Sequence, residues 1–485
     1  MVLSRETNES SDESNSKAGS SPSLAEGKKI TQYLAAMVVN LAAFCNGAVI
    51  GWASPMVPVL QSEDSPLDQG AINTDEGSWL SSLVCLGAIV ATVLYLYLTH
   101  YLSRKLTGYL VAVPFILTWI LVIYAKSVPL LYLHVYVAET VEDSVRGALA
   151  SYLILFGNAG LVFAYIVGSV ASYYTHAYIM IQIPILYLIC YIWMPETPIY
   201  LINTGRNIDA ERSLRWLRGD NDDLLQKEMH KTVSFIKERK ALPEAASIKD
   251  IFTSVGSRKA LIIGTVLVAN LQFCGIYAIL SYAVNIFQEA GSGLSPHTSS
   301  IIIGLVQFAG SCASALLIDK AGRKILLLIS NASMAICLAA IGVYFFLKYL
   351  EKDTTSIGWL PVTCLSIFIF AIALGLAPVT FIKGKATTII VSIMWFLSFL
   401  MAKFYPSMTD VLGIHGCYWF FSICCILGVF YCLFAVPETK NRVLNLYYLN
   451  SVDINRTAWL KKWKIYNCYF SHNFVFFYVN NNFIN

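Results

Sequence analysis

Charged side chains are scarce in this sequence. Only 13% of its 485 residues are Asp, Glu, Lys or Arg, and 56% are hydrophobic. A soluble protein of average composition has about 25% charged residues. The composition therefore argues against a soluble protein, and we expect no nucleic-acid partner. The formal net charge of +4 says little by itself, because the positions of the charges matter more than their sum.

Enzyme motifs are missing as well. The sequence has no GxxxxGK[ST] phosphate loop, no GxSxG and no HExxH, and its seven histidines are scattered. The 12 cysteines form no CxxC pair, and most lie inside apolar runs. We interpret them as small buried hydrophobic side chains rather than disulfides or metal ligands. We therefore expect no enzymatic activity, no cofactor and no metal.

Long apolar runs are what the sequence has in abundance. Most approach the roughly 20 residues that a helix needs to span a hydrocarbon core. The runs are 33–60, 79–99, 106–124, 149–172, 178–194, 261–287, 301–318, 325–347, 360–382, 388–401 and 417–436. They predict an all-α polytopic membrane protein with about 12 transmembrane helices.

One apolar stretch is too short to span a membrane. Only residues 128–138 separate Lys126 from Glu139, and a helix of that length covers about 16 Å. The number of crossings before the basic loop 201–259 must nevertheless be even. We therefore expect residues 128–138 to cross or re-enter as a truncated fourth span.

The charges outside these runs predict an orientation. The loop 201–259 contains twelve Lys and Arg residues, whereas the loop 61–77 contains five acidic and no basic residues. Basic loops stay on the cytoplasmic side. We therefore expect both termini in the cytoplasm, with residues 1–29 as a disordered tail, and the protein in the plasma membrane.

The chain repeats itself. "THYLSRK" (99–105) is matched by "IDKAGRK" (318–324), and "MPETP" (194–198) by "VPETK" (436–440). This predicts a helix bundle over 30–194, a cytoplasmic linker over 195–259, a second bundle over 260–436 and a tail over 437–485. Two six-helix bundles in tandem resemble the major facilitator superfamily, in which the glycine of "DKAGRK" permits a tight turn.

Longer motifs carry a more specific resemblance. "YVAETVEDSVRGAL" (136–149), "PETPIYL" (195–201) and "LQFCGIYAILSYAVNIF" (271–287) are together similar to the sugar porter family. "GWASP", "DEGSWLSSL" and "RGALASY" resemble the insect facilitated trehalose and hexose transporters. The resemblance covers roughly residues 32–443. It implies facilitated transport of a sugar, trehalose or a hexose, by alternating access. No Asp or Glu lies in 33–60, which favours passive uniport by a monomer over proton coupling.

Several positions depart from the pattern of the family. They are His100 and Ser103 in the first hinge, and Ile154, Leu271, Phe381 and Met394 at positions that are polar or Trp in glucose facilitators. These departures keep open an alternative function, that of a non-transporting relic or a sugar-sensing receptor.

A sugar inside a membrane needs partners for its hydroxyl groups and an aromatic face. The candidate substrate-binding residues are Gln272, Gln307, Tyr282, Asn285, Trp395 and Asn46. The resemblance implies that the two glutamines and Trp395 contact sugar. The alternative for each glutamine is a helix–helix hydrogen bond, and the alternative for Trp395 is a position facing lipid. Asn46 stands beside Gly47, where a break in the first helix would expose backbone. Asn40 and Asn158 are expected to be structural.

Charged residues at the predicted cytoplasmic ends form a candidate gate. The resemblance points to Glu139, Arg146, Asp319, Arg323 and Glu438. Ion pairs between the two bundles would hold the outward-facing state and break on inward opening. Solvated charges at helix ends are the alternative, above all for Asp319.

Overall fold

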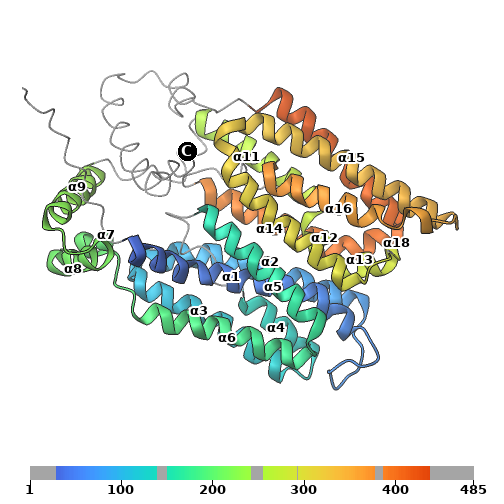
Figure 1. Cartoon of the computed structure of the whole chain (residues 1–485), viewed down its shortest axis with the longest axis horizontal. Coiled ribbons are helices and arrows are strands. Elements are labelled where there is room, and N and C mark those ends of the chain that lie inside the picture. Colours follow the sequence, from blue (N-terminus) through green and yellow to red (C-terminus); the bar gives the residue numbers. More distant parts are fainter. Residues whose placement is uncertain (1–28, 139–149, 242–254, 292, 377–385, 437–485) are drawn as a thin grey trace, which may run out of the picture.

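The computed structural model describes residues 29–138, 150–241, 255–291, 293–376 and 386–436. This part of the chain is helical and contains no strand. Its helices form two groups that lie side by side with nearly parallel long axes, and a smaller helical unit projects from one end (Figure 1). The predicted all-α polytopic fold is confirmed.

The first group, called the N-bundle, surrounds one hydrophobic core. Its helices are α1 (Lys29–Leu60), α2 (Thr74–Tyr101), α3 (Arg104–Tyr124), α4 (Val128–Ala138), α5 (Ala150–Val170) and α6 (Tyr173–Ile192). Large aromatic side chains fill the core, among them Trp52, Trp119 and Tyr187. Helix α4 begins at Val128, as predicted for the fourth span, and is helical up to Ala138, the last residue described before 150.

The second group, called the C-bundle, has a separate core. Its elements are α11 (Val255–Phe273), α12 (Ile276–Ser281), α13 (Ala283–Ala290), α14 (Pro296–Ala321), α15 (Arg323–Tyr349), α16 (Leu360–Ala371), the π-helix η3 (Ile372–Leu376) and α18 (Ala386–Phe434). Helix α18 is interrupted at Gly413, where the backbone leaves the helical region (φ 69°, ψ 161°). It therefore provides two of the predicted spans.

The two ends of the molecule can be told apart by the segments that they carry. The connection of residues 61–73 between α1 and α2 marks the "loop end". The opposite "linker end" carries α7 (Pro198–Asn203), α8 (Asn207–Arg218) and α9 (Asp222–Ala241) (Figure 1). By length and composition, nine helices in the described part could cross a membrane, and one of these is the interrupted α18.

The two hinge motifs make their turns by different means. Gly322 joins α14 to α15 with a positive φ of 92°, which suits glycine because it lacks a Cβ atom. At the first hinge Ser103 has an ordinary φ of −68°, and its Oγ accepts a hydrogen bond from the backbone N–H of Leu106 at 3.1 Å. Serine therefore replaces the family's glycine here by capping the N-terminus of α3.

One expectation about an individual helix was wrong. Helix α1 runs through Asn46 and Gly47 without a break. A Cβ atom at Gly47 would lie 1.8 Å from the carbonyl oxygen of Gly157, so the glycine instead permits close packing of α1 against α5. The span predicted within 261–287 is present over Leu261–Ser281, but it contains a turn that the sequence did not indicate, because Gly275 adopts a left-handed conformation (φ 83°) between α11 and α12.

Candidate functional site

A seam of contacts joins the N-bundle to the C-bundle. Towards the loop end, the hydroxyl of Tyr165 on α5 donates a hydrogen bond to the carbonyl oxygen of Leu280 at 2.8 Å. The backbone N–H of Val284 donates to Ser54 Oγ on α1 at 3.3 Å. These contacts hold the loop-end halves of the two bundles together.

A charged group on α18 also crosses this seam. Lys403 Nζ donates to Asp75 Oδ1 and to Ser78 Oγ, the latter at 2.8 Å, and lies 4.4 Å from the ring centroid of Trp79. All three partners belong to α2. The Lys403 side chain is only 12% exposed, so the ammonium group is largely enclosed by these contacts.

Nearer the middle of the helices, amide groups connect α5 to α14. Gln307 Nε2 donates to Asn158 Oδ1 at 3.1 Å, and Asn158 Nδ2 donates to Ser311 Oγ at 2.7 Å. Ser311 Oγ in turn donates to the carbonyl oxygen of Gln307 at 3.0 Å. Asn158, predicted to be structural, is thus joined directly to one of the candidate sugar-binding residues.

Four of the candidate residues bury a polar atom that has no hydrogen-bond partner among the described residues. These atoms are Gln272 Oε1, Gln307 Oε1, Asn285 Oδ1 and Trp395 Nε1. A buried polar group without a partner costs about 1–3 kcal/mol. The first three are acceptors and the fourth is a donor, which matches the needs of a hydroxyl-rich ligand.

The local backbone explains why α11 ends just after Gln272. Helix α11 ends at Phe273, and the chain turns at Gly275, whose N–H donates to the carbonyl oxygen of Gln272 at 3.0 Å. The ring of Phe421 occupies the space where a Cβ of residue 275 would stand, with its nearest carbon 2.6 Å away. Gly275 is therefore required both by its backbone angles and by its neighbour.

The other candidates have more defined surroundings. Tyr282 is buried, and its hydroxyl donates to the carbonyl oxygen of Ala402 at 3.2 Å. Trp395 is 6% exposed and packs edge-on against Tyr277, which removes the lipid-facing alternative. Asn46 is half-buried on α1.

The substituted family positions bring apolar side chains to this region. Leu271 is 7% exposed within the C-bundle core, while Ile154 and Met394 are half-buried. Phe381 lies outside the described residues, as do the gate candidates Glu139, Arg146 and Glu438. The backbones of Asp319 and Arg323 end α14 and begin α15, but their side chains are outside the description.

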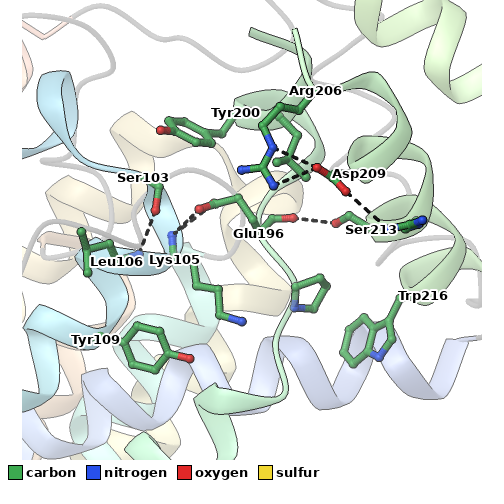
Figure 2. Close-up of a pocket in the computed structure, with 13 residues that line it drawn as sticks. Ser103, Lys105, Leu106, Tyr109, Glu196, Tyr200, Arg206, Asp209, Ser213 and Trp216 are labelled. Carbon is green, nitrogen blue, oxygen red and sulfur yellow. Dashed lines mark hydrogen bonds and ion pairs between the residues drawn. The ribbon is translucent and has the colours of Figure 1, made fainter. Parts of the chain in front are cut away.

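A cavity of about 580 Å³ lies elsewhere, at the linker end between the start of α3 and helices α7 and α8 (Figure 2). Both carboxylate oxygens of Glu196 accept the backbone N–H of Lys105 at 3.1 Å. Ser213 donates to the carbonyl oxygen of Glu196 at 2.6 Å. The sequence marked Glu196 only as part of a repeated motif and did not indicate this contact.

Three of the charged residues around the cavity pair with one another, and Lys105 Nζ donates to the carbonyl oxygen of Ile192 at 3.3 Å. Arg206 binds Asp209 at 2.8 Å, and Arg212 lies 3.7 Å from the same carboxylate. Figure 2 shows Glu196 between these residues and Lys105. We therefore interpret the cavity as the joint between linker and N-bundle, and the seam as the functional site.

The described helices have the same fold as solved transporters of the major facilitator superfamily. The inward-open xylose transporter XylE from E. coli aligns with a TM-score of 0.67 at 18% identity, covering 87% of this chain and 100% of that chain. The proton:xylose symporter XylE bound to 6-bromo-6-deoxy-D-glucose aligns with a TM-score of 0.63 at 19% identity, covering 86% and 99%. At these identities the likeness shows the fold alone.

Sequence comparison identifies the family. The family described as "Sugar (and other) transporter" matches residues 130–448. The facilitated trehalose transporter Tret1 of Bombyx mori is 33% identical over 440 residues, covering 85% of each chain. The Tret1-2 homolog of Drosophila simulans is 32% identical over 450 residues, covering 87% of this chain and 91% of that protein. The chain belongs to the sugar transporter family, and the predictions of a sugar porter and of a non-enzyme are confirmed.

Proposed function

We propose that the protein is a uniporter that carries trehalose or a hexose down its gradient across the plasma membrane by alternating access. The observation that supports this proposal best is the set of buried, unpartnered polar atoms on Gln272, Gln307, Asn285 and Trp395. Of these residues, Gln307 bonds across the seam and Trp395 packs in one cluster with Cys85 and Ala88 of α2. A sugar between the bundles offers hydroxyl groups to each of them. The curated relatives named as facilitated trehalose transporters support the substrate class.

The passive mode rests on the composition of α1. Helix α1 has no Asp or Glu over its 32 residues, so it offers no carboxylate to carry a proton beside the sugar. We further propose that the linker end faces the cytoplasm, because the linker is basic and the 61–77 loop is acidic. Glu139, Arg146, Asp319, Arg323 and Glu438 stay our proposed gate at that end, and 30–194, 195–259 and 260–436 stay our proposed domains.

Tracer uptake tests this function. The full chain is expressed in oocytes, its surface delivery is confirmed, and uptake of labelled trehalose and D-glucose is followed with and without a pH gradient. We expect saturable uptake of at least one sugar that does not accumulate above its external concentration and does not respond to the gradient. Normal surface delivery without uptake of either sugar would favour a relic or sugar sensor instead.

A further inference from the structure

Helix α5 presents one continuous face to the C-bundle. Leu161, Val162 and Tyr165 surround Gly304 on α14, where a Cβ atom would lie 3.1–3.6 Å from their side chains. One turn towards the linker end, the same face carries Asn158. A turn further still, Ile154 is half-buried and has no polar side-chain atom. Asn158 is thus the amide that α5 brings to the middle of the seam.

Both polar atoms of the Asn158 amide form their hydrogen bonds across this seam. Its Oδ1 accepts from Gln307 and its Nδ2 donates to Ser311, both on α14, and it forms no bond within its own bundle among those that the structure describes. By contrast, Asn40 on α1 donates to the carbonyl oxygen of Ala36 one turn away, and Asn331 on α15 donates to that of Leu327. Asn331 also accepts a hydrogen bond from Asn270 Nδ2 on α11 at 2.6 Å, so both asparagines bond within their own bundle, whereas Asn158 connects two bundles.

The partner of Asn158 is only partly satisfied. Gln307 gives its Nε2 to Asn158, while its Oε1 is buried without a partner among the described residues. An inserted hydroxyl group can donate to this oxygen and accept from the same Nε2 or from Asn158. The exchange replaces protein–protein hydrogen bonds by protein–sugar hydrogen bonds, so it leaves few groups unpaired.

We propose that Asn158 is a sugar-contacting residue that determines specificity, and that it exchanges its bonds to Gln307 and Ser311 for bonds to the sugar. This inference rests on the proposed function. Because Asn158 and Gln307 belong to different bundles, a sugar between them replaces a direct link by a bridged one. Occupancy of the site is thereby coupled to the separation of the two bundles, which transport requires.

A comparison of deoxy sugars tests the contact. Half-saturation for uptake of D-glucose and its 2-, 3- and 6-deoxy derivatives, and of trehalose, is measured for the wild type and for Asn158→Leu. One neutral hydrogen bond corresponds to about a 2- to 10-fold change in affinity. We expect the wild type to lose that factor for at least one deoxy derivative. The variant should bind the parent sugar more weakly and no longer distinguish it from that derivative.

Ser311→Ala provides the matched control. It removes the partner of Asn158 Nδ2 but leaves the Asn158 amide in place, so discrimination among the deoxy sugars should persist. If Asn158→Leu keeps the wild-type discrimination, or if Ser311→Ala abolishes it equally, Asn158 is a structural link between bundles and the inference alone fails. If the wild type takes up and binds neither sugar, the proposed function fails and the inference with it.

Discussion

Helix α5 makes two kinds of contact on two adjoining faces. Towards α1 it packs backbone against backbone, since a Cβ atom at Gly160 would lie 2.1 Å from the carbonyl oxygen of Phe44. Towards α14 and α12 it uses side chains and a few hydrogen bonds, those of Asn158 and Tyr165. The first face has no room for movement, while the second can open by breaking a small number of contacts. The difference indicates which interface is permanent and which one transport must open.

Disrupting the packing of α5 against α1 should have the largest effect, measured as the yield of folded protein. Gly160→Leu places a side chain against the backbone of α1, and overpacking typically costs 1–3 kcal/mol or more. We expect little folded protein after detergent extraction, as judged by size-exclusion chromatography and thermal melting. Gly293→Ala is the control, because a Cβ there meets nothing within 4 Å. Equal yields of the two variants would contradict close α1–α5 packing.

Removing a predicted sugar contact in the C-bundle should have the next largest effect. Gln272→Leu retains the volume but removes an amide that is 5% exposed, and each lost hydrogen bond is worth about 0.5–1.5 kcal/mol. We expect a several-fold rise in half-saturation with normal surface delivery. Gln182→Leu, on the exposed face of α6, should leave uptake unchanged. Unchanged half-saturation in Gln272→Leu would return Gln272 to a structural role.

Weakening the seam at the loop end should shift the arrangement of the bundles. Tyr165→Phe loses the 2.8 Å bond to Leu280, worth about 1 kcal/mol. We expect a longer mean distance between spin labels at Ser127 and Asp353, measured by electron–electron double resonance. Tyr187→Phe loses a similar 2.9 Å bond to Gly108 inside the N-bundle, so it should lower stability without changing that distance. A shift of similar size in both variants would refute the distinction between the faces.

The charged contact across the seam should matter least. Lys403 is largely enclosed, but its partner Asp75 is 73% exposed. Lys403→Met should therefore shift the equilibrium between bundle arrangements, followed by the same spin-label distances, by well under about 1 kcal/mol. High salt should reduce the difference between the variant and the wild type. Arg215→Gln is a charge control outside the seam. Arg215 donates hydrogen bonds to Glu211 and to Asp222, and these bonds, the one to Glu211 first, raise the pKa of its guanidinium group. Both contacts lie within the linker. Its replacement should leave the distance unchanged.

The sequence predicted the helices better than the seam. Apolar length indicates where most spans lie, and the start of α4 at Val128 was predicted from the apolar residues that follow Lys126. Pairing between distant helices has no such local signal. Asn158 and Asn40 look alike in sequence, yet one bonds to another bundle and the other to its own helix.

Backbone breaks were predicted correctly only where a motif marked them. Gly322 stands in a recognisable hinge, whereas Gly275 lies inside an unbroken apolar run, and the need for glycine there comes partly from the ring of Phe421, which is far along the chain. Glu196 was missed for a related reason, because its capping of α3 depends on a contact between residues 91 positions apart.

The contacts of Glu196 can form during synthesis before those of the seam. Its partners Lys105 and Ser213 emerge from the ribosome before any part of the C-bundle, and chains fold from their N-terminal units first. The seam must wait, since its bonds join residues 149 positions apart at Gln307–Asn158 and 328 at Lys403–Asp75. The N-bundle and its linker can thus pack together before the C-bundle side of the seam has been synthesised.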